Sequence, residues 1–197
     1  VREFLRFGRV VVCDNGSGDR TGLEAQEAGA RVIFEHRRGK GFAIRKLLSY
    51  GSDATIVVDG DGAFNADNVE KMVEMVRNKG VDMVIGRRRD INAHNKNRVI
   101  LRSLFLRILR VLFQLRFRRR ISDFLSGFRV MNKKTVELLG KSLKSRGFEV
   151  ETEMTLIALK QNLKIREVDV GVGERSSGRQ KSNIFNVGFP VLKKLLF

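Results

Sequence analysis

Hydrophobic residues along this chain alternate between short continuous runs and longer runs with helical spacing. The continuous runs resemble buried strands and lie at 10–12, 31–34, 56–58 and 83–85. The stretches between them predict helices over about 21–29 and 42–50, and an amphipathic helix over 69–80 with apolar residues at 69, 72, 73 and 76. Strand and helix alternating at this spacing predict parallel βαβ units in a layered α/β sheet.

Polar clusters follow three of these strands: DNGSGD at 14–19, DGDG at 59–62 and GRRR at 86–89. Ligands of such sheets bind beyond the carboxyl ends of the strands, so we expect one ligand site at that edge. No internal repeat, low-complexity tract or proline-rich linker interrupts the pattern. Residues 1–197 are therefore predicted to form a single domain.

The composition narrows the class of partner. Lys and Arg number 39 against 22 Asp and Glu, and the net charge of +17 points to nucleic acid, an anionic membrane surface or a phosphorylated substrate. The single Cys13 excludes an intramolecular disulfide and fits a reducing compartment. No apolar run reaches the length of about 18 residues that a membrane-spanning helix requires.

Two of the glycine-rich clusters are candidates for binding a nucleotide or a phosphate. DNGSGDRT at 14–21 is either a turn with a helix N-cap or a site where Asp14 accepts hydrogen bonds from a nucleobase or ribose. HRRGKGFA at 36–43 places Lys40 between glycines before a helix, where backbone N–H groups and a cation can receive phosphate. The second cluster lacks the full P-loop pattern, so by itself it is a weak signal.

Asp59 and Asp61 are separated by one residue, and each is followed by glycine. Asp-Gly is common turn chemistry, so a turn is one interpretation. Two ionised carboxylates this close repel each other unless a cation lies between them. Hard oxygen ligands of this kind suit Mg²⁺ or Mn²⁺, usually shared with substrate phosphates.

In order along the chain, these stretches resemble inverting glycosyltransferases with a GT-A fold, of the dolichol-phosphate mannosyltransferase or polyprenol-phosphate glycosyltransferase type. DNGSGDRT, HRRGKGFA, DGDGA and GRR stand where that family reads DDGSxDGT, NxGKGxA, DADxQ and a GSR-like strand end. Downstream, SDFLSGFRVMNKKTVE, GFEVETEM and ERSSGRQK are similar to SDxxSGFRxxxxxxxE, GxxFxxEM and RxxGxSK. The resemblance spans roughly residues 8–190 and implies a Rossmann-like, mostly parallel sheet flanked by helices.

The resemblance implies a nucleotide-sugar donor site. Asp14 would bind the base or ribose. Asp59 and Asp61 would lie around a Mg²⁺ or Mn²⁺ ion and the diphosphate, with Asp61 favoured as the direct ligand. Lys40 and Arg88 would belong to the same donor-binding site.

On the acceptor side, the resemblance implies catalytic roles for four residues. Arg175 and Lys181 would close over the donor diphosphate or the acceptor phosphate. Asp123 would face the acceptor, and Arg129 belongs to the same stretch. Glu153 either helps to build the acceptor side or is a helix-start carboxylate.

The expected reaction transfers a sugar from a GDP- or UDP-linked donor to a polyprenol phosphate with inversion. The metal and the basic loop would stabilise the leaving diphosphate while an acceptor oxygen attacks the anomeric carbon from the opposite face. A lipid phosphate is already ionised near neutral pH, and Asp123 would then position groups. An alcohol acceptor would need a base, with Asp123 as the candidate. A soluble or polysaccharide acceptor is the alternative.

The chain departs from the family pattern at four places. Ala63 replaces the glutamine that is often a metal ligand, Asn15 replaces the second aspartate of DDGS, and Gln180 replaces the serine of the RxxGxSK loop. The family's first strand has no counterpart before Val10, and residues 1–7 resemble the end of the helix that follows it. About 30 residues would supply that strand and helix, so we expect an N-terminally truncated chain or a misassigned gene start.

The segment 98–120 is basic and amphipathic. A polar stripe at helical spacing consists of Ser103, Arg107, Arg110, Gln114 and Arg118, and most other positions are apolar. Such a helix suits the interface of an anionic membrane, and its alternative is burial against the sheet or in a homodimer. Residues 185–197 are also apolar and basic and would be a second interfacial contact or lead into a further segment.

These features together predict a peripheral protein on the cytoplasmic face of a membrane, with a homodimer or a separate membrane subunit as further partners. The competing class is a non-enzymatic nucleic-acid-binding protein, whose phosphate contacts would be the RRR tracts at 87–89 and 118–120. No nucleic-acid-binding motif is present, and this alternative leaves the DGD triplet unexplained. We therefore expect no nucleic-acid partner.

Overall fold

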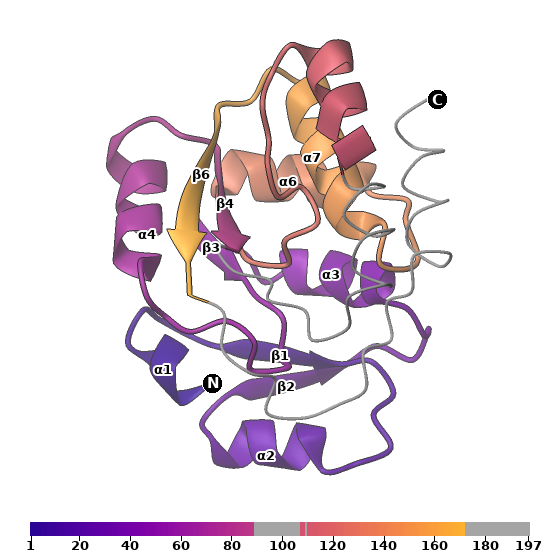
Figure 1. Cartoon of the computed structure of the whole chain (residues 1–197). Coiled ribbons are helices and arrows are strands. Elements are labelled where there is room, and N and C mark those ends of the chain that lie inside the picture. The colour runs from indigo at the N-terminus through magenta and orange to yellow at the C-terminus, as the bar shows by residue number, and fades with distance from the viewer. Residues whose placement is uncertain (89–106, 109, 172–197) are drawn as a thin grey trace, which may run out of the picture.

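The computed structural model describes residues 1–88, 107–108 and 110–171 (Figure 1). In chain order, the elements are α1 (Arg2–Leu5), β1 (Val11–Asp14), α2 (Thr21–Glu27), β2 (Arg31–Phe34), α3 (Lys40–Leu48), β3 (Ala54–Val57), α4 (Val69–Asn78), β4 (Met83–Arg88), β5 (Arg129–Asn132), α6 (Lys133–Ser142), α7 (Val150–Lys160) and β6 (Ile165–Val170). The alternation of strands and helices predicted up to β4 is present, and β2 has the predicted bounds. The α/β fold class is confirmed.

The strands form two sheets within the described residues. β1 and β2 are parallel, with Val11 opposite Arg31. The other four strands have the order β3-β5-β4-β6, in which β5 is antiparallel to both neighbours and β4 is parallel to β6. Three strands of this second sheet therefore share one direction. The antiparallel β5, inserted between β3 and β4, was not among the strands predicted from the apolar runs.

β1 and β3 each have one unpaired edge among the described residues. Among the described residues, β1 pairs only with β2, and β3 pairs only with β5. The additional first strand implied by the family resemblance stays a prediction.

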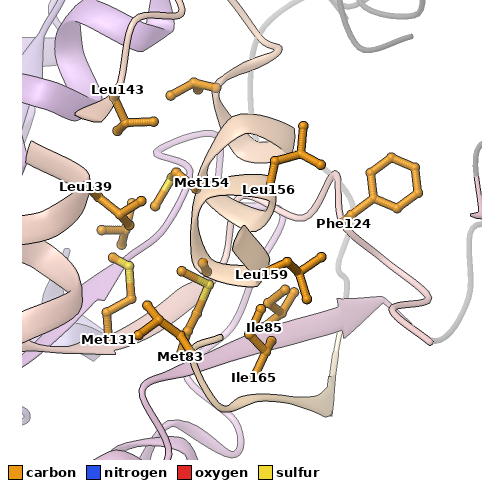
Figure 2. Close-up of a cluster of buried hydrophobic side chains, with 14 of the residues drawn as sticks. Met83, Ile85, Phe124, Met131, Leu139, Leu143, Met154, Leu156, Leu159 and Ile165 are labelled. Carbon is orange, nitrogen blue, oxygen red and sulfur yellow. The ribbon is translucent and has the colours of Figure 1, made fainter. Parts of the chain in front are cut away.

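Alternate residues of the four-stranded sheet enter two different cores, as the two-residue period of a strand requires. Val84 and Val130 pack with Val69, Met72 and Val76 of α4 on one face. The opposite face is built by Met83, Ile85, Met131 and Ile165 with α6 and α7, as Figure 2 shows. The sheet is therefore covered by helices on both sides (Figure 1).

Helix α7 lies in the second core and is buried on nearly every side. Nine of its residues are buried, including two glutamates in its first turn, Glu151 and Glu153. A buried carboxylate requires a cation or hydrogen-bond donors beside it. The start of α7 is thus the place where the fold concentrates buried charge.

Candidate active site

Asp59 and Asp61 lie in the segment that follows β3. Asp59 Oδ1 is 2.6 Å from the Nζ atom of Lys40, the first residue of α3. Asp61 Oδ1 accepts a hydrogen bond from the backbone N–H of Ala63 at 3.1 Å, and Gly62 has a φ of 75°. DGDG therefore forms a turn, and this turn holds both carboxylates at the end of a buried strand. The two interpretations of the motif are compatible.

Lys40 also forms an ion pair with Glu151 in the first turn of α7. Burial raises the pKa of the Glu151 carboxyl, and the Lys40 ammonium acts in the opposite direction. Burial alone would lower the pKa of Lys40, but Glu151 and Asp59 outweigh it and the pKa is raised. The pKa of Glu151 remains raised overall, so the ion pair with Lys40 offsets only part of the cost of burying this carboxylate.

Sequence analysis did not single out Glu151. The motif GFEVETEM carries glutamates at 149, 151 and 153, and their spacing does not show which one reaches the sheet edge. Glu153 instead accepts hydrogen bonds from the backbone N–H groups of Ser145 at 2.7 Å and Lys144 at 3.2 Å. This geometry is that of the helix-start carboxylate, one of the two interpretations of Glu153.

The glycines beside Lys40 allow two parts of the chain to approach closely. The N–H of Gly41 donates to the backbone oxygen of Arg146 at 3.0 Å. A Cβ atom on Gly39 or Gly41 would overlap the backbone of residues 145–146. The GKG motif therefore docks α3 against the loop before α7, and this docking brings Lys40 to Glu151.

Asp14 lies at the end of β1, next to the Lys40 loop. Its Oδ1 atom accepts a hydrogen bond from the N–H of Ser17 at 2.8 Å, and it lines a surface hollow of about 630 Å³ together with Arg20 and Arg31. The next residue, Asn15, bonds to the N–H of Gly39. Asp14 is thus connected to the Lys40 cluster through its neighbour.

Arg88, the last residue of β4, is clamped by Asp123. Its Nε and Nη2 atoms donate to the two carboxylate oxygens of Asp123, each at 2.8 Å. Burial would lower the pKa of Arg88, but the hydrogen bonds and charge of Asp123 raise it, with smaller contributions from Asp59 and Glu151. Arg88 therefore belongs to the same electrostatic cluster as Lys40. Both carboxylate oxygens of Asp123 are engaged by Arg88, so Asp123 fixes the position of this guanidinium.

Arg129 was expected to contribute to the acceptor side, but the structure places its side chain inside the protein. Its side chain is among the most deeply buried in the described residues, and its Nη2 atom donates to the backbone oxygens of Phe124 and Glu151 at 2.9 and 2.8 Å. Burial lowers the pKa of Arg129 to about 10, although nearby carboxylates act in the opposite direction. Because its Nη2 atom donates to the backbone oxygen of Glu151, Arg129 holds the start of α7 in place.

The SGF motif, residues 126–128 before β5, packs against the carboxylate of Asp59. The Ser126 hydroxyl donates to the backbone oxygen of Gly86 at 2.6 Å, and Phe128 is fully buried. A Cβ atom on Gly127 would collide with the carboxylate of Asp59. Glycine at 127 therefore leaves room for Asp59.

Part of the predicted site lies outside the described residues: Arg175, Lys181 and positions 98–106 and 109 of the basic segment. The described part of that segment is helical at 107–108 and 110–117. Phe113 is buried and stacks on Phe124 with ring centres 4.4 Å apart. Ile108, Val111 and Leu115, named here the apolar stripe, are exposed by 49%, 55% and 74%. Leu112 and Phe117 pack against the same core as Phe113, so one side of this helix is anchored while the apolar stripe is exposed to solvent.

The carboxylates of the site offer an incomplete set of metal ligands. No group of three or more His, Cys, Asp or Glu residues within the described ranges could hold a metal ion. Asp59 and Asp61 supply the hard oxygens that Mg²⁺ and Mn²⁺ prefer. The residues therefore fit an ion that shares the oxygens of a diphosphate, and they do not form a metal cage of their own. None of the described helices is long and apolar enough to cross a membrane.

Solved structures with this fold include glucosyl-3-phosphoglycerate synthase from Mycobacterium tuberculosis in complex with phosphoglyceric acid. That match has a TM-score of 0.72 and 24% identity, and covers 95% of this chain and 68% of the other. The same enzyme in complex with Mn²⁺, UDP-glucose and phosphoglyceric acid matches with a TM-score of 0.70 and 23% identity, over 94% of this chain and 66% of the other. At these identities, the likeness shows the fold.

Comparison with sequence relatives shows the family as well as the fold. Glycosyltransferase AglJ of Haloferax volcanii is 33% identical over 175 residues, which cover 87% of this chain and 56% of AglJ. The chain thus spans little more than half the length of that relative. UDP-N-acetylglucosamine–dolichyl-phosphate N-acetylglucosaminyltransferase of Methanococcus voltae is 22% identical over 212 residues, which cover 96% of this chain and 84% of that protein. The family model described as glycosyl transferase family 2 matches residues 7–140, and the chain belongs to this family.

Proposed function

We propose that this chain transfers a sugar from a GDP- or UDP-linked donor to a polyprenol or dolichol phosphate, with inversion at the anomeric carbon. The observation that carries the proposal is the charged cluster at the end of β3. There, Asp59 is ion-paired with Lys40 beside Asp61, in a chain of glycosyl transferase family 2. Parallel strands ending in such groups are the usual place for a phosphorylated ligand.

The donor would lie along the loops that follow β1, β3 and β4. Asp14 would accept hydrogen bonds from the base or ribose, and Asp59 and Asp61 would hold a Mg²⁺ or Mn²⁺ ion with the diphosphate. Such an ion, when bound, neutralises the charge that develops on the leaving diphosphate. Arg88, fixed by Asp123, would add positive charge near the diphosphate.

The acceptor would attack without a strong protein base. A lipid phosphate is ionised near neutral pH, which agrees with Asp123 being engaged by Arg88. Arg175 and Lys181 would close over the phosphates, as the family resemblance implies. The name of the Methanococcus voltae relative, which includes dolichyl-phosphate, supports a lipid-phosphate acceptor at low identity.

The apolar stripe supports a membrane contact. Ile108, Val111 and Leu115 are exposed on a helix that also carries Arg107, Arg110 and Arg116, so the charge complements anionic headgroups. We propose peripheral attachment to the cytoplasmic face of a membrane through this helix. A homodimer or a separate membrane subunit would cover the same apolar side chains and is the alternative.

Calorimetric titration of GDP and UDP with and without Mn²⁺ tests the donor site. We expect one nucleotide to bind in a metal-dependent way and Asp61→Ala to abolish this binding. The matched control is Asp53→Ala, an exposed aspartate before β3, which should bind as the wild type does. Wild-type protein that binds neither nucleotide, or a loss of binding in both variants, would refute the donor assignment.

Liposome flotation tests the acceptor assignment. Binding to vesicles containing anionic lipid is expected for a polyprenol-phosphate enzyme and not for a transferase with a soluble or polysaccharide acceptor. Binding to nucleic acid without any metal-dependent nucleotide binding would instead favour the non-enzymatic alternative.

A further inference from the structure

Lys40 occupies the space between two carboxylates that come from different parts of the chain. Its Nζ atom is 2.6 Å from Asp59 Oδ1 and is also ion-paired with Glu151 Oε1. Exposed fractions are 20% for the Lys40 side chain, 30% for Asp59 and 6% for Glu151. The Asp59 carboxylate is thus partly accessible to solvent, whereas that of Glu151 is buried.

The backbone around this triad holds it in place. The start of α3 is bonded to the loop before α7 through Gly41 and Arg146, and the backbone oxygen of Glu151 accepts from Arg129. Gly127 leaves room for the Asp59 carboxylate and no more. The ammonium and its two partners therefore meet where the start of α3, the turn after β3 and the start of α7 come together.

An ammonium at this place competes with any other cation for Asp59. Lys40 and a divalent ion bound at Asp59 and Asp61 would be like charges on one carboxylate, in a setting where solvent screens them little. Two carboxylates and one ammonium leave the triad with one net negative charge when all are ionised. Lys40 thus compensates one of the two negative charges of the triad before any ligand arrives.

We propose that Lys40 is the resident cation of the donor site and that it gives up Asp59 when a divalent cation and a nucleotide diphosphate bind, while Glu151 retains the ammonium. The inference rests on the proposed function, because it takes Asp59 and Asp61 as the metal-binding pair. Glu151 then acts as a positioning residue: it provides a second partner for Lys40 and so lowers the cost of releasing Asp59. A lysine whose only role is to bind phosphate would not require an ion pair with a buried carboxylate such as Glu151.

The test is the affinity for Mn²⁺, measured by calorimetry and by electron paramagnetic resonance, first without nucleotide and then with GDP or UDP present. Lys40→Met removes the competing charge, so we expect Mn²⁺ to bind more tightly, on the order of tenfold. Glu151→Gln leaves Lys40 with Asp59 as its only carboxylate partner in the triad, so Mn²⁺ should bind more weakly than in the wild type. Lys160→Met, at the exposed end of α7, removes the same charge away from the site and should leave the affinity unchanged.

A second readout covers the case in which Lys40→Met folds poorly because Glu151 loses its cation. Mn²⁺ should then raise the unfolding temperature of Lys40→Met more than that of the wild type, since ligand binding to the folded state is linked to stability. Lys40→Gln, which keeps hydrogen bonding without charge, should show the same gain in Mn²⁺ affinity.

The outcomes separate this inference from the proposed function. If GDP or UDP binds with Mn²⁺ but neither Lys40 variant gains Mn²⁺ affinity, or Glu151→Gln loses none, Lys40 is an ordinary phosphate ligand and the inference is wrong. If the wild type binds no nucleotide at saturating Mn²⁺ although the Lys40 and Glu151 variants shift the metal affinity as expected, the transferase assignment fails and the cation exchange stands. If neither the wild type nor any variant binds Mn²⁺ with or without GDP or UDP, both are refuted.

Discussion

The side-chain oxygen of Asn15 accepts a hydrogen bond from the backbone N–H of Gly39 at 2.8 Å. Its amide nitrogen donates to the backbone oxygens of Glu35 and Arg37 at 2.9 and 2.8 Å. Asn15 therefore closes the loop that delivers Lys40, and it needs both a donor and an acceptor to do so. This explains, for this chain, the asparagine at a position where the family resemblance expected aspartate.

Replacing Asn15 with aspartate should open this loop. The carboxylate keeps the bond to Gly39 but places negative charge against two carbonyl oxygens that lose their donor, at an expected cost of about 1–3 kcal/mol in the free energy of unfolding. Urea unfolding measures the cost, and Asn78→Asp at the exposed end of α4 is the control for added charge. Equal stability of the two variants would show that the loop does not depend on the amide.

Gly127→Ala should damage the site through packing. The added methyl group would collide with the carboxylate of Asp59, so we expect metal-dependent nucleotide binding to be lost or strongly weakened. Gly140→Ala in α6 is the matched control, because a Cβ atom there meets nothing within 4 Å. That control should gain about 0.5–1 kcal/mol of stability, as alanine favours helix over glycine. Unaltered nucleotide binding in Gly127→Ala would contradict the close approach.

Arg88 and Asp123 should be energetically coupled. Their side chains are 21% and 12% exposed and share two hydrogen bonds of 2.8 Å, so a double-mutant cycle with Arg88→Met and Asp123→Asn should give a coupling of about 1–3 kcal/mol in unfolding free energy. Urea unfolding of the wild type, the two single variants and the double variant measures it. Additive effects would mean that Asp123 does not position Arg88 and would favour the alternative role of Asp123 as a base.

Membrane attachment should depend on the apolar stripe and not on charge alone. Leu115→Glu places a charge at a side chain that is 74% exposed, so folding stability should change by no more than about 0.5 kcal/mol. Flotation with vesicles of phosphatidylcholine and phosphatidylglycerol should fall well below that of Gln114→Glu, an adjacent exposed position given the same charge. An equal decrease in flotation of both variants would show that membrane binding depends on electrostatic attraction and not on the apolar stripe.

Glu35 should make stability depend on acid pH. Hydrogen bonds from the Arg37 side chain and backbone, together with its charge, lower the pKa of Glu35 from 4.5 to about 2. A lowered pKa stabilises the folded state above pH 4.5, and this contribution is lost as pH falls from 4.5 towards 2. Glu35→Gln lacks this contribution, so the gap in unfolding free energy between wild type and variant should narrow over that range. A gap that does not change with pH would contradict the Glu35–Arg37 pair.

The amino-acid sequence by itself determined the order of strands and helices from β1 to β4, because apolar periodicity is local. It also placed Asp14, Asp59, Asp61 and Arg88 at strand ends, since turn residues follow each apolar run. The family could be recognised for the same reason, from short motifs in a fixed order. These features require only neighbours in the chain.

Tertiary structure alone decided which charged side chains meet. Glu151 reaches Lys40 across more than a hundred residues because Gly39 and Gly41 let α3 dock before α7, and Arg129 turns inward because the backbone of Glu151 offers it an acceptor. Asp123 pairs with Arg88 for a similar reason, across the end of β4. A motif shows that a charge is present. Only the packed chain shows which opposite charge compensates it, because a buried charge must find its partner in three dimensions.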